Sequence, residues 1–162
     1  MLRQLKIIAL ACLLLVVFVA GVSLLFERKT RKPTEAEFDS EFNRVAENLI
    51  FGFTLPDSQA LTELDGGCKS APDASNPSCV EYVKHLRDID PKLGTVVYHL
   101  DELLDNPPPN YDREEFEAAT DFLELYTLTH EANLMLLEAW DSNDPATWVH
   151  GWELRDSLKT DS

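Results

Sequence analysis

The side chains of this chain that are best suited to proton transfer or metal binding are its four histidines: His85, His99, His130 and His150. His99 and Glu102 are three residues apart, a spacing that places two ligands on one face of a helix. That face is the polar side of the helix expected there, so we interpret both as solvated surface residues. The histidines therefore predict no metal site.

His130 differs from the other histidines because it falls among apolar residues. It lies near Tyr126 and Asn133 on a mostly apolar helix face, which predicts an internal hydrogen-bonded cluster. The alternative is a single metal ligand completed by another helix. A di-iron carboxylate bundle would need Glu-x-x-His twice, and Thr127 stands three residues before His130.

No motif of nucleophilic or phosphate-transfer chemistry is present. The sequence has no GxSxG elbow, no glycine-rich phosphate loop and no dinucleotide fingerprint, and its six glycines are scattered. We therefore predict no catalytic residue, no cofactor and no metal, and a protein that is not an enzyme.

Two cysteines bracket a segment that has little structure of its own. Cys68 and Cys79 enclose a loop rich in proline, serine and alanine, after Gly66 and Gly67. A disulfide closing this loop would stabilise the fold by about 2–3 kcal/mol, mostly by constraining the unfolded chain. The alternative is two free thiols. Because disulfides persist in oxidising compartments, the pairing favours a domain outside the cytoplasm.

A row of carboxylates is the chief candidate for partner binding. It keeps helical spacing along one side of a long, otherwise apolar segment and consists of Glu114, Glu117, Asp121, Glu124, Glu131 and Glu138. The alternative interpretation is the solvent edge of a core helix. Trp148 and Trp152 near the C-terminus are the second candidate, either as core residues or as an anchor for a partner, since tryptophan is enriched in binding hot spots.

The elements that must position these residues are all helical. No alternating strand pattern exceeds four residues, while apolar residues recur at helical spacing throughout. Prolines at 56 and 91 are expected to end or begin helices. We predict an all-α bundle of about five helices after the N-terminal segment, with helical stretches near residues 34–53, 57–64, 80–89, 91–104, 112–141 and 144–158.

The N-terminal segment predicts a membrane anchor. Residues 7–26 are twenty residues without a charge, which as a helix would be roughly 30 Å long, the thickness of a bilayer's hydrocarbon core. Apolar residues continue beyond the passable cleavage site at residues 19–21, so we favour an uncleaved signal-anchor over a cleaved signal peptide. Residues 1–32 are thus an anchor with a basic collar, and residues 33–162 a separate domain.

That domain is strongly acidic. Residues 33–162 hold 8 basic and 28 acidic residues, a net charge of −20, whereas the whole chain has −15. Such a charge disfavours nucleic acid and anionic lipid as partners and favours a neutral or basic protein. The basic residues that flank the span favour a cytoplasmic domain slightly. We give more weight to the expected disulfide of the cysteine loop, which favours the opposite side. We expect an extracytoplasmic domain, periplasmic in a Gram-negative bacterium.

These patterns together predict a single-pass membrane protein whose helical domain binds another protein, as an accessory or assembly subunit of a cell-envelope complex. One alternative is a membrane-tethered inhibitor or immunity protein that neutralises a basic toxin or hydrolase, since charge complementarity accelerates association. A second alternative is an enzyme of unknown type.

Overall fold

The computed structural model describes residues 31–64 and 66–158, and in these ranges every regular element is helical. The chain divides into two units, Met1–Pro33 and Thr34–Ser162, and the second is the helical domain. The predicted span at residues 7–26 lies outside the described residues. Within the described ranges, no helix is long and apolar enough to cross a bilayer.

The first helix of the domain, α2 (Glu35–Leu49), begins at a capping box. The Thr34 side chain accepts a hydrogen bond from the Glu37 backbone N–H, and the Glu37 carboxylate accepts one from the Thr34 backbone N–H. Each residue thereby satisfies a donor that a helix start leaves unpaired. The helix then buries Phe38, Val45 and Leu49 against the bundle.

The break that we expected at Leu55-Pro56 does not occur. A π-helical turn, η1 (Ile50–Thr54), joins α2 directly to α3 (Leu55–Thr62), so that one continuous rod runs over these three elements. The Leu55 backbone N–H bonds to the Ile50 carbonyl, five residues back. Pro56 falls in the first turn of α3, and the wider π turn before it accommodates a residue that cannot donate a backbone hydrogen bond.

The expected break at Asp90-Pro91 is also absent. A single helix, α4 (Pro77–Leu104), contains Pro91 in its interior. Ile89 and Leu93 are both buried, so core packing on each side of the proline holds the helix together. Pro91 itself is exposed, and the carbonyl of Arg87 that it leaves without a helical partner lies on an exposed residue.

The last two helices agree closely with their predicted ranges. They are α5 (Arg113–Ser142), which Asp112 caps, and α6 (Pro145–Ser157), which Asp144 caps. Asn143 joins them in the left-handed conformation, with φ 52°, which asparagine tolerates well. A Cβ added at Gly151 on α6 would lie 3.0 Å from Leu136 Cγ on α5, so the glycine permits the two helices to approach closely.

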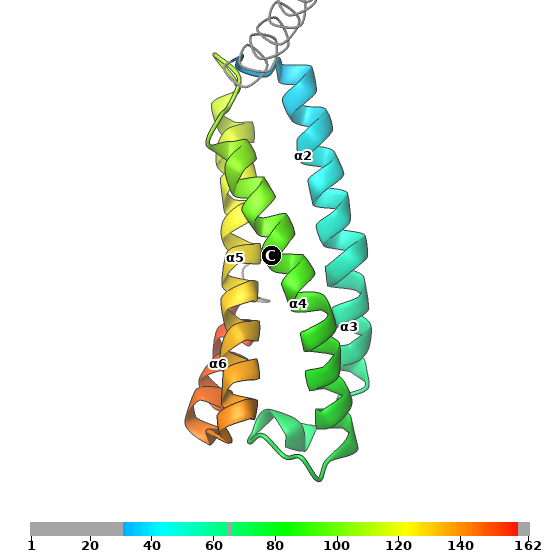
Figure 1. The fold of residues 1–162 in the computed structure, drawn as a ribbon. Coiled ribbons are helices and arrows are strands. Elements are labelled where there is room, and N and C mark those ends of the chain that lie inside the picture. Colours follow the sequence, from blue (N-terminus) through cyan, green and yellow to red (C-terminus); the bar gives the residue numbers. More distant parts are fainter. Residues whose placement is uncertain (1–30, 65, 159–162) are drawn as a thin grey trace, which may run out of the picture. The chain divides into compact units, whose positions relative to one another are not determined.

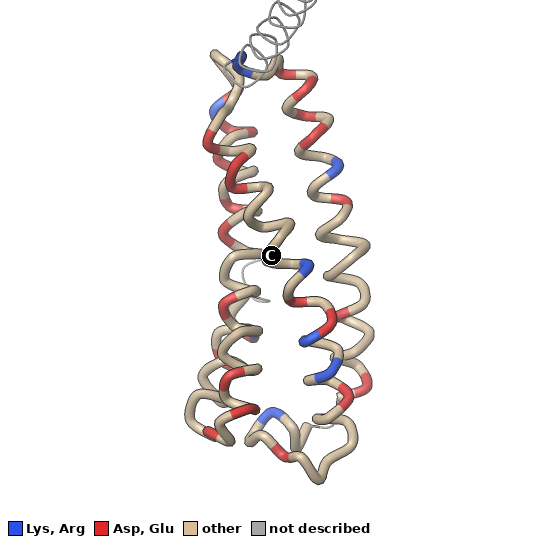
Figure 2. Tube along the Cα trace, viewed as in Figure 1, with Lys and Arg blue, Asp and Glu red and all other residues tan. Residues whose placement is uncertain are grey.

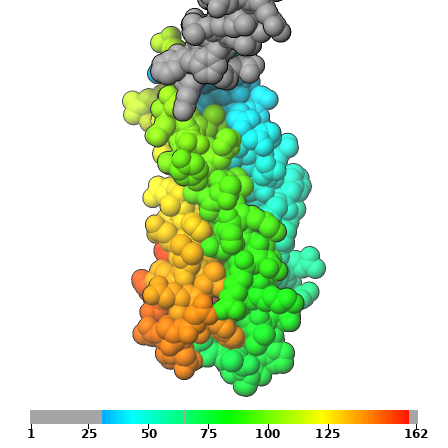
Figure 3. All heavy atoms as spheres, in the orientation of Figure 1, coloured from blue at the N-terminus to red at the C-terminus, as the bar shows by residue number. Residues whose placement is uncertain are grey.

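The helical domain is thus a bundle of four rods, α2 with α3, α4, α5 and α6 (Figure 1). Successive rods run in opposite directions, and α5 packs most extensively against its neighbours α4 and α6. Figure 3 shows the side chains of α4 filling the space between α5 and α2 on the face nearest the viewer. The all-α expectation is confirmed for the described residues. The last rod is much shorter than the one before it, since α6 has 13 residues and α5 has 30.

Candidate functional site

The predicted row of carboxylates lies along α5, and all six of its side chains are exposed. We call this row the acidic edge; it comprises Glu114, Glu117, Asp121, Glu124, Glu131 and Glu138. In Figure 2, acidic residues recur along the whole of α5. The helix carries eight acidic residues and one basic residue, Arg113, whose Nε donates to Glu117 at 2.7 Å. The other five carboxylates of the acidic edge have no ion-pair partner among the described residues, so α5 presents uncompensated negative charge.

The two tryptophans proposed as partner anchors are in the interior. Trp148 is 0% and Trp152 is 3% exposed. The Trp148 Nε1 donates to the Cys68 carbonyl at 2.7 Å, and the Trp152 ring stacks on Tyr82 with centroids 5.3 Å apart. Their core interpretation therefore holds, and neither indole can anchor a partner at the surface of this domain.

Cys68 and Cys79 form the predicted disulfide. Their Cα atoms are 5.4 Å apart, and both residues are fully buried. Cys68 belongs to a short 3₁₀ turn, η2 (Gly66–Lys69), and Cys79 to the first turn of α4. Because Trp148 bonds to the Cys68 carbonyl, the bridge also fixes α6 against this end of the bundle, which we call the disulfide end.

A chain of polar side chains crosses the core at mid-bundle and joins all four rods. Arg155 of α6 donates to Asp57 of α3 and to the amide oxygen of Asn133 of α5. The Asn133 side-chain amide donates to Asp90 of α4 at 3.1 Å. His130 Nδ1 lies 2.9 Å from the same Asp90 oxygen. Buried charges are expensive unless they are paired or hydrogen-bonded; here Arg155 pairs with Asp57, and Asp90 accepts a hydrogen bond from Asn133.

The hydrogen-bonded cluster predicted around His130 and Asn133 is confirmed, but the sequence did not reveal its partners. Asp57, Asp90 and Arg155 are 6%, 2% and 4% exposed. Among these three partners, only Asp90 stands out in the sequence as a candidate buried polar residue, because it lies among the apolar residues of its helix. Asp57 also falls in the first turn of a helix, where acidic residues are ordinary, and Arg155 in a last turn, where basic residues are ordinary.

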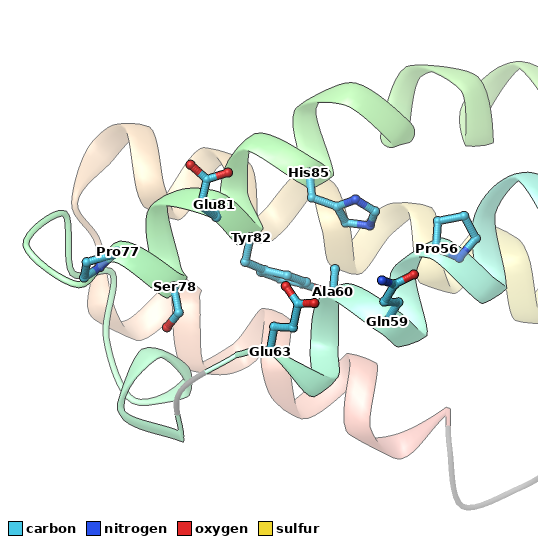
Figure 4. A pocket seen from close by; sticks show the side chains of 9 residues that line it. All are labelled: Pro56, Gln59, Ala60, Glu63, Pro77, Ser78, Glu81, Tyr82 and His85. Carbon is cyan, nitrogen blue, oxygen red and sulfur yellow. The ribbon is translucent and has the colours of Figure 1, made fainter.

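A pocket of about 590 Å³ opens between α3 and α4 (Figure 4). Its lining is mixed in polarity and comprises Pro56, Gln59, Ala60, Glu63, Pro77, Ser78, Glu81, Tyr82 and His85. Three buried atoms near it lack a hydrogen-bond partner among the described residues: the Tyr82 hydroxyl, His85 Nε2 and Asp57 Oδ1. His85 Nε2 and Asp57 Oδ1 lie 3.5 Å apart. Burial raises the pKa of the Tyr82 hydroxyl well above its usual range, so the phenol stays neutral.

His99, which we considered as a metal ligand, takes part in a surface cluster between α2 and α4. Its Nε2 lies 2.8 Å from Glu41, and Arg44 Nε donates to the same carboxylate at 2.9 Å. The bond from Arg44 first, and that from His99 second, lower the pKa of Glu41 to about 2. Glu102 instead accepts a hydrogen bond from Tyr98. Among the described residues, no three His, Cys, Asp or Glu side chains gather as a metal site.

A groove runs between the α2–α3 rod and α5, and we call it the α2–α5 groove. Pairs of aromatic rings join its two walls: Phe38 with Tyr111, Phe42 with Phe122, and Phe53 with Tyr126. One part has a volume of about 450 Å³ and is lined by Asp39, Phe42, Asn43, Tyr111, Glu115, Ala118, Ala119 and Phe122. A smaller part, about 180 Å³, includes Phe53, Tyr126, Arg155 and Leu158. The two parts adjoin at Phe122 and Tyr126, whose rings are 4.8 Å apart.

Comparison of this chain with protein-family models, with curated proteins and with solved structures finds no match. The sites of the helical domain are therefore interpreted from their own chemistry.

Proposed function

We propose that residues 33–162 form a protein-binding domain without catalytic activity, held at a membrane by residues 7–26. In this proposal the protein is an accessory or assembly subunit of a cell-envelope complex. Its domain faces the oxidising side of the membrane, which is the periplasm in a Gram-negative bacterium. The disulfide between Cys68 and Cys79 supports that side, because such a bond persists outside the cytoplasm.

The observation that carries the proposal is that all six side chains of the acidic edge are exposed. Its carboxylates lie on one rigid helix, and only Glu117 is neutralised by a neighbouring cation among the described residues. A fixed row of like charges attracts a basic partner and repels acidic surfaces, so it favours both fast association and specificity. The partner is therefore a protein that presents basic residues.

Charge reversal on the acidic edge tests this proposal. The double variant Glu124→Lys/Glu131→Lys changes two exposed residues of α5, and Asp88→Lys/Asp101→Lys makes the same change of charge on exposed residues of α4. Each full-length variant is extracted from its native membrane in mild detergent, and co-purifying proteins are quantified by mass spectrometry. A fusion that carries only residues 1–32 controls for contacts made by the anchor.

We expect one or a few proteins to co-purify with the wild type and with the α4 variant, and to be lost from the α5 variant. A single soluble basic partner would favour the tethered inhibitor, whereas membrane-protein partners would favour the complex subunit. The proposal is wrong if nothing is enriched over the anchor-only fusion, or if both double variants retain every partner equally.

A further inference from the structure

The fourth rod of the bundle stops halfway along the third. At 1.5 Å per residue, α5 is about 45 Å long and α6 about 20 Å. α6 starts beside the disulfide end and ends near mid-bundle, where Arg155 meets Asn133. The N-terminal half of α5 packs against α4 and contacts α2 through the rings of Phe42 and Phe122, while the position beside it that continues the line of α6 holds no described helix (Figure 1).

The surface left in that position is the α2–α5 groove, and it is apolar at its base. Phe42 and Phe122 are half-buried, and Ala118 is exposed. Ile50 is 39% exposed and follows Asn43 by two turns, so it falls on the same side of α2 as the groove lining. Small and aromatic residues at helical spacing on two neighbouring helices form the type of groove that takes an amphipathic helix.

The charges at the groove indicate which helix it takes. Asp39 and Glu115 line its larger part, where no lysine or arginine is present. The Tyr111 hydroxyl donates to Asp39 at 2.7 Å, and burial together with this bond raises the pKa of the phenol, so Tyr111 stays neutral and leaves the charge of Asp39 uncompensated. A second copy would bring the same acidic side chains to the contact, whereas a basic helix would compensate them.

We propose that the α2–α5 groove binds an amphipathic helix of a partner protein, up to about 17 residues long, which is the difference between the 30 residues of α5 and the 13 of α6. The helix continues the line of α6, packs its apolar face on Phe42, Ala118 and Phe122, and places lysines or arginines beside Asp39 and Glu115. This inference rests on the proposed function and specifies it: the groove supplies the apolar contact, and the acidic edge supplies attraction over a longer range.

The test uses a defined probe. A synthetic 14-residue peptide carries leucine at helical spacing, lysine elsewhere and one photo-reactive residue on its apolar face; a second peptide has the same composition in scrambled order. Each is irradiated with the full-length protein in nanodiscs of neutral phosphatidylcholine, and the adduct is mapped by mass spectrometry. Ala118→Trp fills the groove, and Thr120→Trp places the same side chain at an exposed position of α5 outside it.

We expect adducts of the amphipathic peptide within residues 39–54 and 111–126. We also expect Ala118→Trp to reduce the adduct yield about tenfold and Thr120→Trp to leave it unchanged. The groove assignment is wrong if both variants label alike, or if the adducts lie on other faces. It is equally wrong if Ala118→Trp, and not Thr120→Trp, converts a dimer into a monomer in sedimentation equilibrium, because the groove would then hold a second copy.

The outcomes also separate this inference from the proposed function. If both peptides label the acidic edge equally, and Glu124→Lys/Glu131→Lys abolishes the labelling, binding depends on charge alone; the groove proposal fails and the proposed function stands. If neither peptide is captured, the groove proposal fails, and the co-purification experiment alone decides the proposed function.

Discussion

Arg155 and Asp57 form a buried ion pair between α6 and α3, although 98 residues separate them in the sequence. The pair connects the last helix of the bundle to the first rod, and Asn133 extends the connection to α5. It therefore holds the last turn of α6 against α3 and α5.

Removal of the arginine is expected to destabilise the domain strongly. Arg155→Met leaves the Asp57 carboxylate buried without a cation, which should lower the free energy of unfolding by about 3–5 kcal/mol. Asp57→Ala/Arg155→Met removes both charges and should recover much of that loss. Arg113→Met, which breaks an exposed pair with Glu117, should cost at most about 0.5 kcal/mol. Urea unfolding followed by circular dichroism measures all three; equal effects of Arg155→Met and Arg113→Met would contradict the burial of the pair.

Two buried tyrosines should differ in how much stability depends on their hydroxyls. Tyr126 and Thr54 share a hydrogen bond of 2.6 Å, so Tyr126→Phe should cost about 1 kcal/mol. The Tyr82 hydroxyl lies near Asp57 but makes no well-aligned hydrogen bond with a described residue, so Tyr82→Phe should cost little or be stabilising. The same unfolding measurement compares them. A loss of more than about 1 kcal/mol for Tyr82→Phe would show that a bound water or ligand satisfies this hydroxyl.

The Glu41 carboxyl should titrate well below the other surface glutamates. Its pKa of about 2 means that the bonds to Arg44 and His99 stabilise the fold above the ordinary glutamate pKa of 4.5. That contribution is lost as the pH falls from about 4.5 to about 2. It amounts to only about 0.5 kcal/mol, because the pair is partly exposed and solvent screens it. Carboxyl NMR should show the pKa rising towards 4.5 in Arg44→Ala; an unchanged pKa would show that the guanidinium does not cause the shift.

The disulfide predicts both the number of thiols that can be alkylated and the free energy of unfolding of the domain. Alkylation of unfolded protein from its native compartment should add one label without reductant, at Cys12, and three after reduction. Replacing both paired cysteines by alanine should lower the free energy of unfolding by about 2–3 kcal/mol, because a bond between residues 11 positions apart no longer constrains the unfolded chain. Three labels without reductant would contradict both the bond and the extracytoplasmic side inferred from it.

Local signals in the sequence were sufficient to predict much of the fold. Asp112 and Asp144 are N-caps followed by helical patterns, and both helices begin where these residues predict. The predicted breaks at the two prolines were wrong, because a proline ends a helix only where core packing on both sides does not hold the helix together. Pro91 lies between buried residues, and Pro56 follows a π turn, so in each case the helix continues.

The candidate sites were predictable only where a single helix contains them. The acidic edge lies on one helix, and its exposure follows from helical spacing. The pairing of Asp57 with Arg155 depends on two helices meeting, and no spacing within either helix indicates it. The α2–α5 groove is likewise a product of tertiary structure, since it follows from the difference in length between α5 and α6.

The most direct test of the central claim, that α5 presents a partner-binding surface, is site-specific photo-crosslinking in intact cells. A photo-reactive residue replaces Glu124 on the acidic edge or Asp101 on α4, both of which are exposed. We predict a covalent adduct with one defined protein from position 124 and none from position 101. No adduct at position 124, or the same adducts from both positions, would contradict the claim.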